Sequence, residues 1–203
     1  MPSSWREKKK TELKQSLYEA ALRMFEGGGY EATTVQQISA EVGVAKGTFF
    51  NHFPSKEHVI SEWYNQITAR AIASARKRPP TSAKVAIAAL FADMSGQATA
   101  SPELMIATAT NHSTTLLLDA TRRQLSEISL YLREQCELAK SNGEMSSDTD
   151  IDFFVQLLTS VLSGTSRAWV LSPERFDFPQ LITQRVQFLF RAVEVTPMIK
   201  ESC

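Results

Sequence analysis

The spacing of apolar positions along the chain predicts helices almost throughout. Between residues 6 and 26, apolar side chains recur three or four positions apart, as on one face of an amphipathic helix. They are Leu13, Leu17, Ala20, Ala21, Met24 and Phe25. Three glycines, at positions 27–29, are expected to end this helix. We find no strand-like alternation of apolar and polar residues and no repeat, so the chain is predicted to be all-α.

Two short helices are predicted after the glycines. Thr33 and Gln36 have the spacing of a capping box, so one helix should begin there and close at Gly43. The other is expected over residues 46–52, because Pro54 prevents its continuation. Two short helices joined by a glycine turn, with longer helices on either side, are typical of a helix-turn-helix.

The second short helix carries residues suited to the major groove of DNA, where the first turn of such a helix faces base edges. Lys46 can donate to guanine O6 and N7, and the Thr48 methyl can meet a thymine methyl. Gly47 leaves room for close approach of the backbone. Phe49 and Phe53, four positions apart, are expected to face the core and anchor the helix.

The distribution of charge agrees with this interpretation, although the net charge is zero. Residues 1–80 contain 12 Lys and Arg against 8 Asp and Glu, whereas residues 81–203 contain 10 against 14. A basic front half joined to an acidic back half is a weak indication of nucleic-acid contact. The EKKK run at residues 7–10 is interpreted either as a solvated helix face or as a basic arm that touches DNA.

The stretch GGGYEATTVQQISAEVGVAKGTFFNHFPSKEHVI, residues 27–60, resembles the DNA-binding segment of TetR-family transcriptional regulators. The family pattern is G-Y-x-x-T-T-V, I-A-x-x-x-G-V and G-T-x-Y-x-H-F-x-x-K. The resemblance implies a ligand-responsive regulator, most often a repressor, that binds a palindromic operator as a homodimer and is released by a small-molecule inducer. A DNA-binding regulator without an inducer is the alternative.

The resemblance also implies roles for individual residues at the DNA. Thr34, His52 and Lys56 would bind phosphate, and Gln36 would touch a base unless it serves as the helix cap. The full predicted set is Thr34, Gln36, Lys46, Gly47, Thr48, Phe50, Asn51, His52 and Lys56. Phe50 stands where the family usually has tyrosine, so a hydroxyl that would reach a phosphate is missing.

A basic, proline-containing break, RKRPPTS, separates the front and back halves of the chain. We expect a DNA-binding domain over residues 1–56, a connecting helix over 55–76, and an effector-binding and dimerisation domain over 77–203. Further helices are predicted near residues 83–97, 102–111, 114–140, 148–171 and 179–195. The last two are strongly apolar, and the resemblance implies that they pair with their twofold mates in the dimer.

An inducer pocket is expected among the middle helices, because a mostly apolar cavity with a few polar groups is typical of small-molecule sites. The candidates are Phe91, Met94, Met105, Thr108, His112, Leu125, Ile128, Phe154 and Leu158. Plain core packing is the more frequent role of such methionines, and His112 is more often a surface or core-edge histidine. The effector would be largely apolar.

Other classes of function find little support in the sequence. No set of residues has the spacing of a catalytic nucleophile and base, so an enzyme is not expected. Three histidines lack metal-ligand spacing, and neither a metal nor a cofactor is expected. No apolar run is long enough for a membrane span or a signal peptide. With only two cysteines, a cytoplasmic location is expected, and a redox role of Cys136 stays open.

Overall fold

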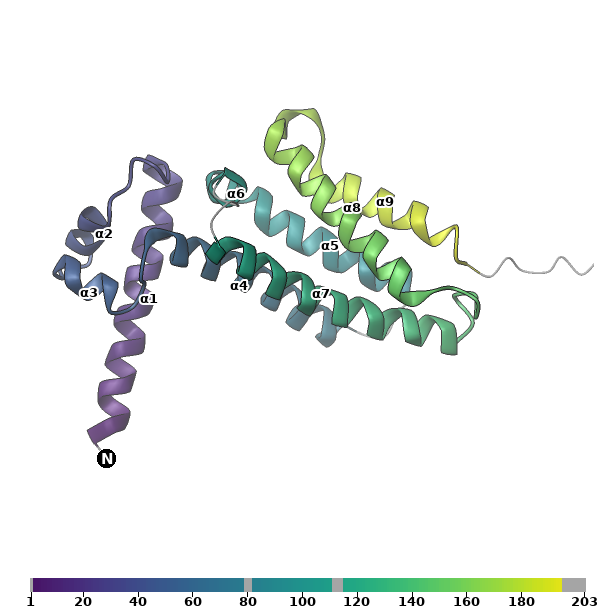
Figure 1. Cartoon of the computed structure of the whole chain (residues 1–203), viewed down its shortest axis with the longest axis horizontal. Helices are drawn as coiled ribbons and strands as arrows, with labels where there is room; N and C mark the ends of the chain where they lie inside the picture. The colour runs from purple at the N-terminus through teal and green to yellow at the C-terminus, as the bar shows by residue number, and fades with distance from the viewer. Residues whose placement is uncertain (1, 79–81, 111–114, 195–203) are drawn as a thin grey trace, which may run out of the picture. The chain divides into compact units, whose positions relative to one another are not determined.

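Nine α-helices and one 3-10 helix account for most of the residues that the structure describes. The computed structural model describes residues 2–78, 82–110 and 115–194. In chain order the helices are α1 (Pro2–Gly28), α2 (Val35–Glu41), α3 (Lys46–Phe50), α4 (Lys56–Lys77), α5 (Ala83–Thr99), α6 (Pro102–Thr110), α7 (Thr115–Ser141), α8 (Ile151–Leu171), η1 (Pro173–Arg175) and α9 (Phe178–Phe190). The predicted all-α class is confirmed (Figure 1). Within these residues, no helix is both long and apolar enough to cross a membrane.

The chain divides into two compact units, each with its own interior. Unit 1 consists of Met1–Gln66 and Ala100–Thr121, and unit 2 of Ile67–Thr99 and Arg122–Cys203. Both units are therefore assembled from two separate stretches of the chain. The predicted functional division, with domains ending at residue 56 and starting at residue 77, stays a prediction.

Unit 1 is built around α1, which packs against α2 and α6, while α2 packs against α3. Its fully buried side chains include Leu17, Phe25, Ile38, Phe49 and Phe53. These residues lie at the spacing that the sequence pattern predicted, and they come from α1, α2, α3 and the turn after α3. The interior of unit 1 thus fixes α2 and α3 against the second half of α1.

The capping box of α2 lies one residue later than predicted. Thr34, not Thr33, is the N-cap: its hydroxyl accepts from the Gln37 backbone N–H at 3.2 Å, and the Gln37 side chain accepts from the Thr34 backbone N–H at 2.8 Å. Thr33 is buried instead, and its hydroxyl donates to the carbonyls of Met24 and Gly29. Gln36 therefore has no capping role.

Three helix ends also differ from the expected positions. The helix α3 ends at Phe50, because the chain continues in a turn in which the Asn51 N–H donates to the Gly47 carbonyl. The helix α8 begins at Ile151, since Asp150 caps it through the Phe153 N–H. The helix α9 ends at Phe190 rather than near residue 195, and a turn follows.

Unit 2 has a core formed by α5, α7, α8 and α9. The helix α5 packs against α9, and α9 packs against α8 (Figure 1). The side chains fully buried there include Ile87, Leu90, Phe91, Ile128 and Leu158. On the surface, two ion pairs join the end of α4 and the residue after it to neighbouring helices: Arg76 of α4 to Glu134 of α7, and Arg78 to Asp93 of α5. Because such pairs are exposed, each stabilises the unit by only about 0–1 kcal/mol.

Candidate DNA-binding surface

The helix α3 is anchored by one face and exposed on the other. Phe49 and Phe53 are buried with their ring centroids 5.6 Å apart, and Tyr18 of α1 stacks on Phe53 at 6.4 Å. On the opposite side Phe50 is 44% exposed and meets the edge of Phe49. Asn51, directly after the helix, is also exposed. The predicted inward orientation of the two phenylalanines is confirmed, and the remaining side chains of α3 face outward or lie at its border.

The first turn of α3 has the exposure that a reading position requires. Lys46 is exposed, and its Nζ lies 5.9 Å from the centroid of the Phe50 ring, a loose contact that leaves the ammonium free to move. A Cβ at Gly47 would meet no atom of the protein within 4 Å. No internal packing therefore requires glycine at this position, and a close approach of an external partner is a use that remains for it. Thr48 is half-buried.

The start of α2 presents Thr34 and Gln36 to solvent. Besides accepting from the Gln37 N–H, the Thr34 hydroxyl donates to Gln37 Oε1 at 2.8 Å. Gln36 is exposed and, because Gln37 completes the capping box, its amide is available to a partner. The two uses of Gln36 that the sequence left open are thus reduced to one. Both residues stay predictions as DNA contacts.

Lys56 has an internal role that the sequence did not indicate. Its Nζ donates to the carbonyls of Tyr30 and Thr33 at 2.8 and 2.9 Å and lies 4.3 Å above the centroid of the Tyr30 ring. Burial raises the pKa of Tyr30, and the carboxylate of Glu57 beside its hydroxyl raises it further. An ammonium group has three protons, so one remains for a phosphate. Lys56 therefore holds the turn between α1 and α2 and can still contact DNA.

His52 lies where α3 meets the basic part of α1. Burial lowers the pKa of His52 from its ordinary value of 6.5, and the positive charges of Lys10 and Lys14 lower it further. The imidazole is therefore mainly neutral at neutral pH in the free protein. A neutral imidazole can donate one N–H to a phosphate, and the negative charge of the phosphate would in addition favour the protonated form.

Duplex binding should consequently strengthen as the pH falls from about 8 to about 6. A phosphate next to His52 raises the pKa of the imidazole in the complex above its lowered value in the free protein, so binding takes up a proton. We expect a gain of about two- to tenfold per protomer, measured by fluorescence anisotropy at constant ionic strength. The His52→Gln variant should lose this pH-dependent gain in affinity. If the variant showed the same pH profile as the unaltered protein, His52 would not be part of the interface.

The predicted inducer-pocket residues are nearly all buried, but they are divided between the two units. Phe91, Met94, Ile128, Phe154 and Leu158 are buried in unit 2, where Leu125 is half-buried. Met105 and Thr108 are buried in unit 1, and the Thr108 hydroxyl donates to the Leu104 carbonyl at 2.8 Å. His112 lies outside the described residues. As a ligand site, this set stays a prediction.

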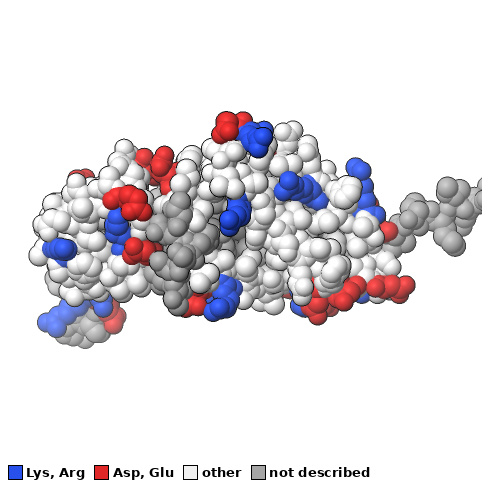
Figure 2. Space-filling view, turned by 45° about the horizontal axis from the view of Figure 1, so that its top comes forward, with Lys and Arg blue, Asp and Glu red and all other residues white. Residues whose placement is uncertain are grey.

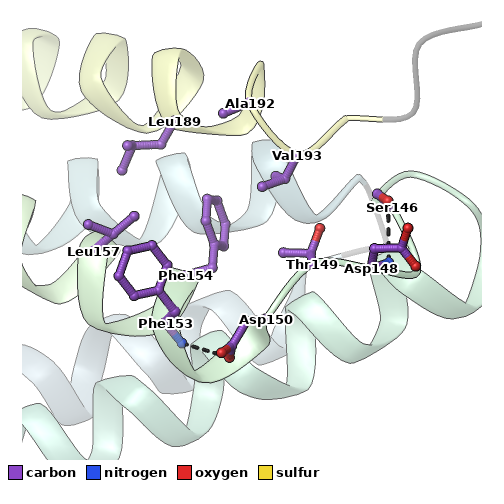
Figure 3. A pocket seen from close by; sticks show the side chains of 10 residues that line it. All are labelled: Ser146, Asp148, Thr149, Asp150, Phe153, Phe154, Leu157, Leu189, Ala192 and Val193. Carbon is purple, nitrogen blue, oxygen red and sulfur yellow. Dashed lines mark hydrogen bonds between the residues drawn. The ribbon is translucent and has the colours of Figure 1, made fainter.

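A cavity of about 380 Å³ opens in unit 2 at a place that the sequence did not indicate. Its lining comes from the loop before α8, the first turns of α8, and α9 with the turn after it (Figure 3). The lining residues are Ser146, Asp148, Thr149, Asp150, Phe153, Phe154, Leu157, Leu189, Ala192 and Val193. Only Phe154 belongs to the predicted set. The segments involved are about 40 residues apart in the sequence, so no local pattern could have joined them.

The surfaces of α8 and α9 expose large apolar side chains. Phe153 and Leu171 of α8 are 59% and 74% exposed, and Phe188 of α9 is 70% exposed. Leu158, in contrast, is completely buried within unit 2. A helix pair that exposes such side chains is typical of a surface that another protein chain covers. The exposed residues, rather than Leu158, are the appropriate positions at which to test the predicted dimer.

Cys136 has the surroundings of a packing residue. It lies in α7 with no exposed surface, and burial raises the pKa of its thiol to about 11, although Arg133 opposes the shift. Because the thiolate is the form that reacts with oxidants, a buried and protonated thiol argues against a redox role.

The helix-turn-helix segment matches a known family. Residues 17–62, which contain α2, α3 and the buried half of α1, match the family model of bacterial regulatory proteins, TetR family. The helix-turn-helix of this chain is that of the TetR family. The TetR match covers the anchored α3 together with Thr34, Lys46, Gly47 and Lys56, so the resemblance noted from the sequence is confirmed.

Relatives of this chain include transcriptional regulators. It is 39% identical over 74 residues to the HTH-type transcriptional regulator TcmR of Streptomyces glaucescens, which covers 36% of this chain and 33% of TcmR. It is 20% identical over 205 residues, 92% of this chain and 98% of the relative, to the fatty acid metabolism regulator protein of Bacillus subtilis. The chain spans a third or less of the curated relatives that it matches at 39% identity or more.

A solved structure extends the similarity in fold to both units. The crystal structure of FadR from Bacillus subtilis in complex with stearoyl-CoA has a TM-score of 0.71, 19% identity, and coverage of 89% of this chain and 99% of the other. At this level of identity the comparison establishes the fold alone. The predicted combination of an N-terminal helix-turn-helix domain and a C-terminal helical domain is confirmed as the fold of the chain.

Proposed function

We propose that this TetR-family protein is a ligand-responsive regulator that reads a palindromic operator through α3. The observation that supports this most directly is the two-sided character of α3. Phe49 and Phe53 are fixed in the core of unit 1, while Lys46, Gly47 and Phe50 are exposed. A short helix held in this way can enter a major groove without losing its own packing.

Two copies of α3 are needed for adequate affinity and specificity. One short helix contacts only a few base pairs, and dimers of such proteins bind half-sites about 34 Å apart. In the proposed homodimer, α8 and α9 pair with the same helices of the second copy. Phe153, Leu171 and Phe188 are the exposed apolar side chains that this pairing would bury. Repression is the proposed outcome, because an operator-bound dimer blocks polymerase access.

The proposed effector is a small, largely apolar molecule that shifts the dimer away from its DNA-binding geometry. Two findings favour an acyl-CoA, in which the acyl chain supplies the apolar part and coenzyme A is charged. A relative aligned over nearly the whole chain is a fatty acid metabolism regulator, and the similar FadR structure holds stearoyl-CoA. An effector can weaken operator binding only by as much as it prefers the other conformation. A regulator without an inducer is the alternative.

Selection of duplexes from a random pool by the full-length protein tests the DNA-reading role. The recovered sequences should contain an inverted repeat with half-site centres about one helical turn apart. The Lys46→Ala variant should bind this duplex about 1–3 kcal/mol more weakly and should tolerate more bases at one position of each half-site. Lys77→Ala, an exposed lysine at the end of α4, is the control. An unchanged base preference would remove Lys46 from the reading positions.

Titration of the selected complex with stearoyl-CoA tests the effector. Release of the duplex by stearoyl-CoA, but not by free coenzyme A, would support an acyl-responsive regulator. Release by stearate alone would assign recognition to the acyl chain. A complex that is indifferent to all three would favour the alternative of a regulator without this class of inducer.

A further inference from the structure

The first half of α1 extends beyond the packed part of unit 1. All side chains from Trp5 to Glu12 are exposed, Leu13 and Lys14 are half-buried, and Leu17 is the first that is completely buried. Figure 1 shows this part of α1 continuing past α3 as a single helix. About three turns of helix thus carry side chains that contribute nothing to the core.

The basic residues of this extension lie on two different faces. Arg6, Lys10 and Lys14 are four positions apart, so they share one face, and this face continues into the buried Leu17 and Ala21. Lys14 shows where the face points: its Nζ lies 5.2 Å from the centroid of the Phe53 ring and 2.7 Å from Glu62. The row of Arg6, Lys10 and Lys14, which we call the α3-side row, therefore runs along the side of α1 that meets α3.

The lowered pKa of His52 agrees with this placement, because Lys10 and Lys14 are the cations that contribute to it. In Figure 2, Lys and Arg atoms lie at the lower left of the view with Asp or Glu atoms beside them, and others are spread over the rest of the face. The basic surface beside the C-terminal end of α3 thus includes the first half of α1, which lies outside the family match.

The lysines on the other side of the extension already have partners. Lys8 lies 3.9 Å from Glu12, and the Nζ of Lys9 lies 4.2 Å above the Trp5 ring. Lys14 of the α3-side row is paired with Glu62. Arg6 and Lys10, in contrast, have no ion pair with any residue that the structure describes. Two unpaired cations about 6 Å apart on one helix face can bind a polyanion without first breaking an ion pair.

We propose that Arg6 and Lys10 bind phosphates of the duplex next to the groove that α3 occupies. This inference rests on the proposed function and adds to it a second element that contacts DNA. Only one residue of the EKKK run, Lys10, takes part, and it does so from an ordered helix rather than a flexible arm. The contact is independent of base sequence, so it contributes affinity and not specificity.

The salt dependence of duplex binding tests this proposal. Each phosphate contact contributes about 0.9 to the slope of log K against log salt. The double variant Arg6→Ala, Lys10→Ala should therefore lower the slope by about 1.8 per protomer and weaken binding at low salt. The matched control is Lys8→Ala, Lys9→Ala, which removes the same charge from the other face. Full-length proteins would be titrated into a fluorescein-labelled 30-bp duplex of mixed sequence, between 50 and 200 mM NaCl, with anisotropy as the readout.

A reduced slope in the first variant and an unchanged slope in the control would support the proposal. An unchanged slope in the first variant, or an equal reduction in both, would overturn it, since the latter would be an effect of net charge alone. Both variants should keep the helix, because alanine has the highest helix propensity and all four side chains are exposed. If the unaltered protein bound neither this duplex nor any selected one, the proposed function itself would fail, and this inference with it.

Discussion

Replacement of Phe188 by aspartate should yield a folded protein that sediments as a monomer and binds the selected palindrome far more weakly. Phe188 is 70% exposed on α9, so its removal costs unit 2 little. In a twofold interface the substitution is present in both subunits, so its effect on the free energy of dimerisation is doubled. Burial of a phenylalanine contributes about 1.5–3 kcal/mol, and a buried carboxylate without a partner costs more. Together these terms raise the dimer dissociation constant by at least about 100-fold.

The measurement is sedimentation velocity at several protein concentrations, with circular dichroism to establish that the helices remain. Leu138→Asp is a suitable control, because Leu138 of α7 is 46% exposed and undergoes the same kind of change outside α8 and α9. A Phe188→Asp protein with an unaltered sedimentation coefficient would place the interface on another surface. Leu158 would be a poor choice, because a charge there enters the core of unit 2 and would unfold it irrespective of dimerisation.

Loss of the dimer should in turn reduce affinity for the palindrome, whereas binding to an isolated half-site should change little. Each α3 then binds independently, and the advantage of a second, linked contact disappears. Comparison of the palindrome with a duplex that contains a single half-site separates this effect from damage to α3 itself. Equal losses on both duplexes would indicate that the substitution had altered the reading helix.

The helix-turn-helix could be predicted because its determinants are local. The glycines at the end of α1, the proline after α3 and the four-residue spacing of Phe49 and Phe53 each act within a few residues of the feature they specify. The misplaced capping box has an equally local origin. Thr33 and Thr34 are both followed by glutamine three positions later, so the pattern fits either register. Only the burial of Thr33 against the end of α1 decides between them.

The sequence pattern could not predict sites that are formed by segments far apart in the chain. The cavity in unit 2 joins the start of α8 to the end of α9, and nothing near Phe153 in the sequence points to Leu189. Likewise, apolar residues at helical spacing are found both in a protein core and in the lining of a ligand pocket, so the spacing does not distinguish the two. Phe91, Ile128 and Leu158 satisfy that description as ordinary interior residues of unit 2.

Lys56 has both a local and a long-range determinant. Its position near the start of α4 could be predicted from the sequence, whereas the groups that its ammonium contacts could not. The two carbonyls that accept from its ammonium belong to residues 26 and 23 positions earlier. A lysine after the helix-turn-helix suggests a phosphate contact. The structure adds that the same ammonium closes the turn from which Thr34 and α2 are presented, so Lys56 also acts as a positioning residue.

The Lys56→Met variant should therefore lose stability as well as affinity for DNA. Methionine retains most of the apolar stem but cannot donate, so the carbonyls of Tyr30 and Thr33 lose a charged donor. Hydrogen bonds to a charged group contribute about 1.5–3 kcal/mol, so we expect a lower free energy of unfolding by about that amount in urea titrations. Duplex affinity should fall for all sequences alike, because the start of α2 loses its fixed position.

The Lys56→Arg variant separates the two roles of this residue. Arginine keeps the positive charge for a phosphate, but its planar, forked donors differ in geometry from the single ammonium that donates to both carbonyls and lies over the Tyr30 ring. If positioning dominates, Lys56→Arg should resemble Lys56→Met in stability and in affinity. If the phosphate contact dominates, the arginine variant should retain the affinity and the salt slope of the unaltered protein. Full stability in Lys56→Met would contradict the positioning role, since the turn would then be held without these hydrogen bonds.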